Sequence, residues 1–165
     1  MIAERGVVVW VTAASAAAAH EVAVLLAEAF AARELRVELL HAERPGLESI
    51  SEPAALGAVA GLLAGHGVHS VIAEAASSRA VRDAARRTLG SMIEVFVQSG
   101  AAGSPTWEAP PQAEVEVDAA AAAAGIPRVL RTLEVLGYLK PRDDLAYSPD
   151  EEREVIKRLK AFGYM

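Results

Sequence analysis

Residues 6–21 read GVVVWVTAASAAAAHE. An apolar strand in this stretch runs directly into a turn and then a helix, which is the layout of a phosphate-binding loop. Such a loop, G-x-x-x-x-G-K-[ST], uses glycine backbone N–H groups to cradle phosphate, a lysine for the β/γ-phosphates and a hydroxyl for Mg²⁺. In this chain the glycine positions hold Ala13, Ala16 and Ala18, the lysine position holds Ala19, and the hydroxyl positions hold His20 and Glu21. The setting of the loop is present, and its chemical groups are missing.

The rest of the chain alternates strands and helices. Five short apolar runs predict strands at 7–12, 36–40, 69–74, 92–97 and 114–117. Helical patterns lie between and after them, at 19–34, 53–65, 79–89 and 124–136, the last starting near Pro127. The first four apolar runs lack clean alternation, which is typical of strands buried on both faces. The pattern predicts an α/β protein with a mostly parallel sheet and right-handed crossovers.

The C-terminal region has clear helix-end signals. The segment SPDE at 148–151 predicts a helix start, with serine as the N-cap, proline as the first helical residue and acids in the first turn. The segments TLEVLGYL (132–139) and RLKAFGYM (158–165) each place a glycine just beyond a helix. Glycine there adopts the left-handed conformation, and apolar residues after it fold back onto the last turn. We expect two well-capped helices.

Length and composition indicate one globular domain. The chain has 165 residues, of which 53% are hydrophobic and 23% charged, enough for a sizeable core. The net charge of −6 argues against a nucleic-acid surface, which needs a basic footprint. Cysteine is absent, which excludes disulfides, thiolate zinc sites and thiol nucleophiles. The chain lacks a signal-peptide pattern and an apolar run of the roughly 18 residues that a membrane helix needs. We therefore expect a cytoplasmic protein that binds neither membranes nor nucleic acids.

Several segments, taken in order, resemble one enzyme family. They are VVWVT (8–12), ELRVELLHAE (34–43), VIAEAASSRAVRD (71–83), MIEVFV (92–97), WEAP (107–110), EVEVD (114–118) and VLRTLEVLGYL (129–139). Their sequence and spacing resemble adenylylsulfate kinase (APS kinase), a P-loop kinase that phosphorylates the 3′-hydroxyl of adenylylsulfate with MgATP. The resemblance implies a three-layer P-loop kinase-like fold with a five-stranded sheet in the order 2-3-1-4-5. It assigns residues 1–140 to that domain and leaves 141–165 as a linker and an extra C-terminal helix on or beside it.

The departures from the family pattern fall on functional positions. The phosphate loop is degenerate at Ala13, Ser15, Ala16, Ala18, Ala19 and His20. The family's acidic DGD is replaced by HAE at 41–43, the segment after it shrinks to about 44–57, and only 98–106 remain of the lid. The alanines at 13–19 are strong helix formers, so the helix is expected to begin early, with Thr12 or Ser15 as N-cap. We expect ATP and Mg²⁺ binding to be lost, with at most weak anion binding at the helix N-terminus.

Polar residues at the carboxyl edge of the sheet have two interpretations. His20, His41, Glu43 and Glu74 all approach that edge, where a doubly wound fold binds ligands. Two histidines with carboxylates could hold zinc or a similar metal. No H-x₃-H or H-E-x-x-H spacing supports a metal, so we interpret them as the polar lining of a vacated cleft, with no metal and no catalytic residue. His69, at the opposite edge, is expected on the surface.

Two further positions also have alternative readings. The family's substrate-contacting SPYR segment is replaced here by Ser77, Ser78 and Arg79. These residues either retain a contact with an anion or cap the helix at 79–89. Capping is favoured. Trp107 either packs over the sheet edge, which is favoured, or lies exposed as an anchor for a partner.

Two classes of function follow from these residues. The first is a pseudokinase that has lost phosphoryl transfer and acts by binding or scaffolding, as a homodimer or with another protein of sulfate or nucleotide metabolism. The alternative is a cleft re-equipped to bind a nucleotide, a sulfated anion or a metal, with residual or new adenylylsulfate-related activity. Loss of catalytic groups at several separate places favours the first.

Overall fold

The computed structural model describes residues 5–41, 44–46, 52–74, 78–103, 105, 107–142 and 149–164. Within these residues the strands are β1 (Val8–Ala13), β2 (Val37–Leu40), β3 (His69–Glu74), β4 (Met92–Gln98) and β5 (Val115–Asp118). The helices are α1 (Ala16–Ala31), α2 (Pro53–Gly65), α3 (Arg79–Leu89), α4 (Ala122–Val135) and α5 (Pro149–Ala161), with a short 3₁₀ turn η1 (Ala119–Ala121) before α4. The strands and helices alternate as the sequence predicts as far as β4, and β5 follows β4 with no helix between them among the described residues.

The five strands form one parallel sheet in the order β2-β3-β1-β4-β5. β1 lies at its centre, with Val9 beside Val71 of β3 and Ile93 of β4. All six residues of β1 are buried, because helices cover both faces of the sheet. The predicted fold class and strand order are confirmed.

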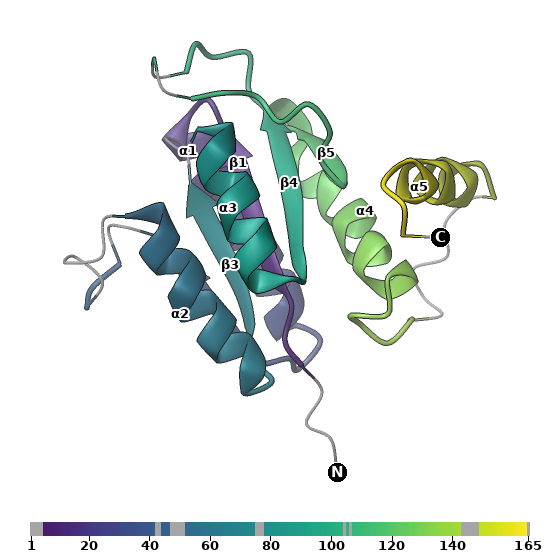
Figure 1. Ribbon diagram of the computed structural model, residues 1–165. Coiled ribbons are helices and arrows are strands. Elements are labelled where there is room, and N and C mark those ends of the chain that lie inside the picture. The colour runs from purple at the N-terminus through teal and green to yellow at the C-terminus, as the bar shows by residue number, and fades with distance from the viewer. Residues whose placement is uncertain are drawn as a thin grey trace.

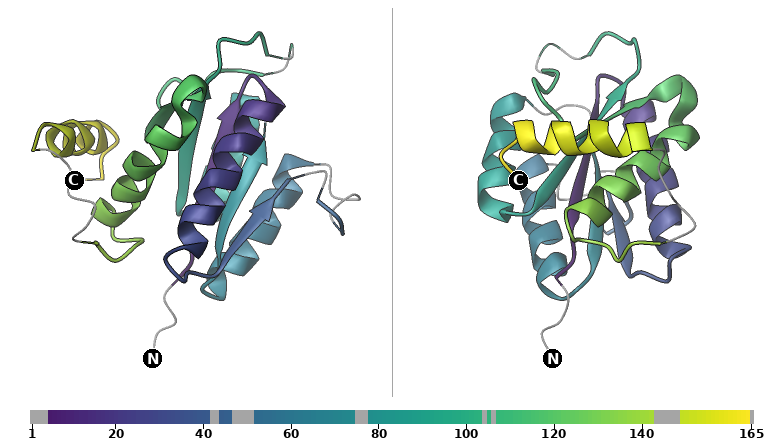
Figure 2. Two further views of the ribbon diagram at one scale, coloured as in Figure 1. Left: turned by 180° about the vertical axis from the view of Figure 1, so that it is seen from behind. Right: turned by 90° about the vertical axis from the view of Figure 1, so that its right-hand side faces the viewer.

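Helices cover the sheet in two layers, one on each face. Figure 1 shows α2 and α3 in front of the sheet, and the left view of Figure 2, seen from behind, shows α1 and α4 on the opposite face. Alternate residues of β1 serve the two sides: Val9 and Val11 pack with α1 and α4, whereas Val8 and Trp10 pack with α2 and α3. The molecule is therefore a three-layer α/β/α structure with a core on each side of the sheet.

The C-terminal helix α5 crosses α4 at the β5 side of the molecule (Figure 2). Its residues Val155 and Leu159 are buried. Arg131 of α4 contacts Glu152 of α5 at 3.3 Å, and Tyr164 beyond the helix reaches Glu114 beside β5. These contacts place α5 against the main body of the protein; the division of the chain at residue 140 stays a prediction.

Both C-terminal helices end as predicted. Gly137 and Gly163 each have a φ of 79°, in the left-handed region. Beyond them, the N–H of Tyr138 donates to the carbonyl of Leu133, and the N–H of Tyr164 donates to that of Leu159. α5 begins at Pro149, as expected, while its proposed N-cap Ser148 lies outside the described residues.

α1 begins at Ala16 with Ser15 as its N-cap, which confirms the early start expected for the helix whose apolar pattern runs from residue 19. Two other local expectations need correction. Pro127 lies in the second turn of α4 instead of at its start, since Asp118 accepts a hydrogen bond from the N–H of Ala120 and starts the helical path earlier. His69 is buried with 8% of its surface exposed, and its Nδ1 accepts a hydrogen bond from the N–H of Val7.

Candidate functional site

The junction of β1 and α1 is where a phosphate-binding loop would lie. Ser15 has extended backbone angles (φ −106°, ψ 126°), and its Oγ accepts a hydrogen bond from the N–H of Ala18 at 3.3 Å. The carbonyl of Ser15 accepts from the N–H of Ala19 at 3.1 Å. Of the two expected N-caps, Ser15 is therefore the one that forms. Two residues separate the end of β1 from the first turn of α1.

The backbone at this junction has no anion-binding nest. A nest needs successive N–H groups that converge through an alternation of right- and left-handed residues. Among the described non-glycine residues, positive φ is found at Glu34 alone, so none of residues 13–19 has it. Ala13 and Ala19 are fully buried in the core beside α1, and the N–H of Ala18 is already bonded to Ser15. The N–H groups of Ala18 and Ala19 are thus both bonded to Ser15, so we describe the first turn of α1 as closed.

The charges near this junction do not suit phosphate. Residues 13–21 contain neither lysine nor arginine, and Glu21 is an exposed acid in the second turn of α1. His20 is exposed too, and its ring stands edge-on to that of His41, with the ring centroids 4.9 Å apart. Of the predicted edge residues, the structure therefore brings these two histidines together.

The other predicted edge residues are placed as follows. Glu74 ends β3 next to Thr12 of β1 and is half-buried, with an interaction of its own. Glu43 and Ser77 lie outside the described residues. Within the part of the chain that the structure describes, no group of three or more histidine, aspartate or glutamate side chains is placed to hold a metal ion.

The start of α3 is capped by a residue that sequence reasoning missed. Ser78 is the N-cap by position, but its side chain makes no capping hydrogen bond. The N–H of Arg79 donates instead to the carboxylate of Glu108, at 2.9 Å. The negative carboxylate suits the positive end of the helix. The capping hydrogen bond predicted for the serines is therefore made by Glu108, which lies 29 positions after Arg79 in the chain.

Trp107 adopts the packed alternative. It is half-buried, its ring lies 6.1 Å from that of Phe96, and its Nε1 donates to Oγ1 of Thr12 at 3.4 Å. Thr12 is fully buried at the end of β1. The indole therefore covers the carboxyl end of the central strand.

A network of buried charges lies between α3 and the sheet. Arg82 Nε is 2.6 Å from Glu94 Oε1, and these side chains are 2% and 7% exposed. Arg82 also donates to the carbonyl of Glu108. Arg86 pairs with both Glu94 and Glu114, and Glu114 accepts a hydrogen bond from the N–H of Glu94 at 2.8 Å. We call these residues the α3 ion network.

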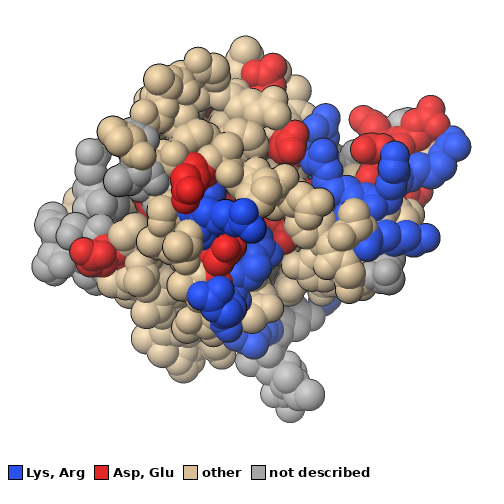
Figure 3. Space-filling model, turned by 45° about the horizontal axis from the view of Figure 1, so that its top comes forward, with Lys and Arg blue, Asp and Glu red and all other residues tan. Residues whose placement is uncertain are grey.

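Burial and charge oppose each other in this network. Burial raises the pKa of Glu94, while the neighbouring Arg82 and Arg86 act to lower it. Burial acts to lower the pKa of Arg86, but the hydrogen bond and charge of Glu114, together with the charges of Glu94 and Tyr164, raise this pKa overall. Figure 3 shows a band of basic side chains mixed with acidic ones across the middle of the molecule. The arginines and glutamates of the network are paired and do not form a single-sign surface.

Comparison with known proteins shows the fold. No protein-family model matches the chain, and no curated protein matches it in sequence. Among solved structures, APE1195 is similar with a TM-score of 0.70 at 16% identity, over 82% of this chain and 98% of that one. The Mycobacterium tuberculosis APS kinase CysC in complex with AMPPNP and APS is similar with a TM-score of 0.66 at 20% identity, over 79% of this chain and 98% of that one.

A third solved structure is the hexameric APS kinase from Thiobacillus denitrificans, similar with a TM-score of 0.64 at 20% identity. The likeness covers 84% of this chain but 31% of that one. At such identities the comparisons establish the fold alone, which this chain shares with these APS kinases. No helix among the described residues is long and apolar enough to cross a membrane.

Proposed function

We propose that this chain is an APS-kinase-like pseudoenzyme that transfers no phosphoryl group and acts by binding other proteins. The observation that carries the proposal is the closed first turn of α1, capped by Ser15. Nucleotide phosphates would need converging N–H donors and a lysine at this place. The chain has Ala19 at the lysine position, and its side chain is buried in the core.

The size of the missing contribution supports loss of catalysis. Phosphoryl transfer depends almost entirely on positioning and on electrostatic stabilisation of the phosphoryl oxygens. Removing one donor to a developing negative charge typically costs about 10²–10³ in rate. Here the lysine, the hydroxyl and the glycine cradle are absent together, so MgATP has no binding site of the kinase type.

The test is a kinase assay together with calorimetry on the whole chain. We expect no phosphorylation of adenylylsulfate by MgATP and no saturable heat with ATP, ADP or adenylylsulfate. A matched variant carries Ala13→Gly, Ala16→Gly, Ala18→Gly, Ala19→Lys and His20→Ser, which rebuilds the loop. The proposal is contradicted if the native chain binds a nucleotide with micromolar affinity, at least as tightly as the rebuilt variant does.

The binding role is proposed to involve self-association or a second protein. Support comes from the fold alone, since one structure of the same fold is described as hexameric. Light scattering after gel filtration measures the mass of the native chain, whose monomer is 17.3 kDa. The proposed scaffolding role is contradicted if the chain is a monomer at all concentrations and captures no other protein in a stoichiometric amount.

The contact between His20 and His41 favours a second candidate, a re-equipped cleft that binds a metal or an anion. Imidazole nitrogens suit zinc and copper. Titration with Zn²⁺ discriminates the candidates, with His20→Ala and His41→Ala as variants and His66→Ala as an exposed control. Saturable zinc binding that both cleft variants abolish, and the control retains, would favour the second candidate.

A further inference from the structure

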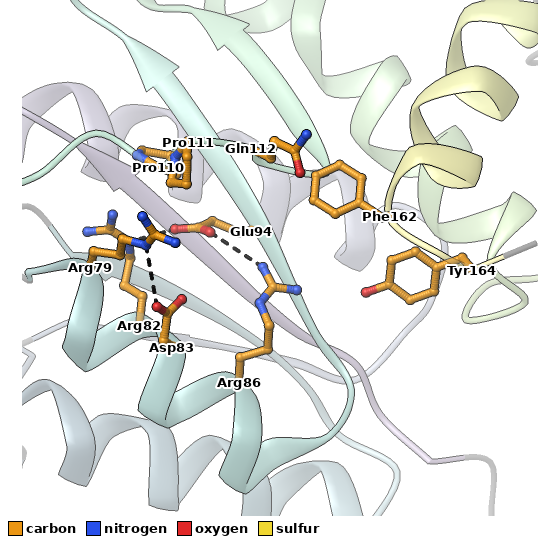
Figure 4. A pocket seen from close by; sticks show the side chains of 10 residues that line it. All are labelled: Arg79, Arg82, Asp83, Arg86, Glu94, Pro110, Pro111, Gln112, Phe162 and Tyr164. Atoms are coloured by element: carbon orange, nitrogen blue, oxygen red, sulfur yellow. Dashed lines mark hydrogen bonds and ion pairs between the residues drawn. The ribbon is translucent and has the colours of Figure 1, made fainter.

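A cavity of about 300 Å³ lies away from the β1–α1 junction. Its walls are the side of α3 that carries Arg79, Arg82 and Arg86, the segment 110–112, and the turn that follows α5. Figure 4 shows the arginines on one side of this space and Phe162 and Tyr164 on the opposite side. None of residues 12–21 lines it. We call it the α3 cavity.

The cationic wall of the α3 cavity contains both fixed and movable groups. Arg82 and Arg86 are held in the α3 ion network by Glu94, and Arg86 also by Glu114. Arg79 is different: its side chain is 58% exposed, and its contact with Asp83 is a 3.5 Å pair at the surface. Such surface pairs contribute little free energy. The guanidinium of Arg79 can therefore exchange Asp83 for an incoming anion at small cost.

The charge of the lining is slightly positive. Three arginines, at 79, 82 and 86, face two carboxylates, at 83 and 94, which leaves one positive charge. Glu114 does not line the cavity; its side chain is fully buried behind Arg86. A carboxylate or a phosphate can accept two parallel N–H bonds from a guanidinium.

The opposite wall is aromatic. The rings of Phe162 and Tyr164 lie 6.5 Å apart at 45° to each other, on either side of Gly163. The hydroxyl of Tyr164 donates to Glu114 at 3.3 Å, which ties this turn to the sheet. Phe162 is half-buried at the cavity, so its ring offers an apolar surface to a ligand. Flat rings pack on such surfaces by offset stacking or edge-to-face contact.

We propose that the α3 cavity binds a small ligand in which a flat ring carries an oxyanion, either a carboxylate or a phosphate. The oxyanion lies toward Arg79 and the ring lies against Phe162. Pockets for small ligands begin at about 300 Å³, which is the size of this cavity. Its lining combines charged groups on one wall with aromatic rings on the other. The proposal is independent of phosphoryl transfer at the β1–α1 junction.

The test follows backbone amide shifts of the whole ¹⁵N-labelled chain during titration with phenyl phosphate and with benzoate. We expect saturable shifts at residues 79–86, 112 and 162–164 with at least one of these probes. Inorganic phosphate and phenol each carry half of the ligand, and each is expected to bind at least tenfold more weakly. Saturable shifts confined to residues 13–21, or no saturable shift with either full probe, would overturn the proposal.

Variants separate this site from general attraction to arginine. Arg79→Ala removes the movable cation, and Phe162→Leu keeps an apolar side chain but removes the flat ring. Each is expected to weaken binding of the better probe about tenfold, the size of one hydrogen bond to a charged group or one ring contact. Arg87→Ala is the control, an exposed arginine of α3 that does not line the cavity. Equal weakening by the control, or none by the two site variants, would overturn the proposal.

Discussion

Arg82 and Glu94 form a buried ion pair in which Nε and Oε1 are 2.6 Å apart. The pair joins α3 to β4, the strand next to the central strand β1. Arg86 is a second cation beside the same Glu94 carboxylate, at 3.4 Å. Removal of one partner of a buried pair leaves a charge without compensation, at a cost of about 3–5 kcal/mol. We expect Glu94→Ala to lower the free energy of unfolding by about 3 kcal/mol in urea titration.

Two control variants make this expectation sharper. The double variant Arg82→Met/Glu94→Leu replaces the pair by apolar groups and is expected to recover most of the loss, because no uncompensated charge is left. Asp83→Ala removes the partner of a surface pair that involves Arg79 and should change stability by less than about 1 kcal/mol. If Glu94→Ala costs no more than Asp83→Ala, the ion network has no structural role.

The Ser15 cap gives a second prediction. Its Oγ satisfies the N–H of Ala18 at the start of α1, and loss of an N-cap costs about 1 kcal/mol. We expect Ser15→Ala to lower the melting temperature, and Ser15→Asn to retain most of the native value because asparagine also accepts the hydrogen bond. Thermal unfolding followed by circular dichroism measures both. Identical melting of Ser15→Ala and the native chain would mean that the cap contributes nothing.

The periodic and terminal features of the fold are the ones that sequence predicts. A short apolar run gives the bounds of β3. Pro53 marks the first residue of α2, and Gly90 follows the last residue of α3. These signals are local, so neighbouring residues carry all the information. The same holds for Ser15, whose capping role depends on the alanines that follow it.

The α3 ion network could not be predicted in this way. An arginine in a polar helix normally points to solvent, and Arg82 is buried because Glu94 and Glu108 reach it from 12 and 26 positions along the chain. The same reason explains Glu108 as the cap of α3 and His69 as the acceptor for Val7. Such pairs depend on the register of the folded sheet, which a linear pattern does not contain.

Stability at alkaline pH gives a third prediction, because burial and the nearby Glu114 raise the pKa of Tyr164 above its ordinary value of 10.0. The unfolded chain therefore loses the phenol proton at a lower pH than the folded chain does. Stability is fully present below pH 10 and falls as the pH rises toward the folded pKa. We expect urea titrations between pH 9 and pH 11 to show this fall.

Tyr164→Phe isolates the contribution of that one group. It keeps the ring and removes the titrating hydroxyl, so its stability should fall less steeply over the same range. A slope remains, since the pKa of Tyr138 is raised too, again mainly by burial. Equal slopes for Tyr164→Phe and the native chain would show that the folded state does not perturb Tyr164.

Two glycines that differ in their surroundings give the fourth prediction. Gly6 is buried just before β1, and its N–H donates to the carbonyl of Ala64 at 2.8 Å. A Cβ at this position would overlap the carbonyl group of Val68 and lie 3.0 Å from the N–H nitrogen of His69. These are backbone atoms, so no side-chain rotation relieves the overlap. We expect Gly6→Ala to lower the free energy of unfolding by about 3 kcal/mol, at the upper end of overpacking costs.

Gly65→Ala is the matched control at the end of α2, where a Cβ would meet nothing within 4 Å. Alanine favours a helix over glycine, so this variant should be neutral or more stable by about 0.5 kcal/mol. Urea denaturation of both variants measures the difference. The two substitutions add the same methyl group. If only Gly6→Ala lowers the free energy of unfolding, the loss comes from the close contact between the backbone at Gly6, before β1, and the backbone at Val68, before β3. Two small, equal effects would mean that this contact relaxes freely, and that the entry to the central strand is not held by it.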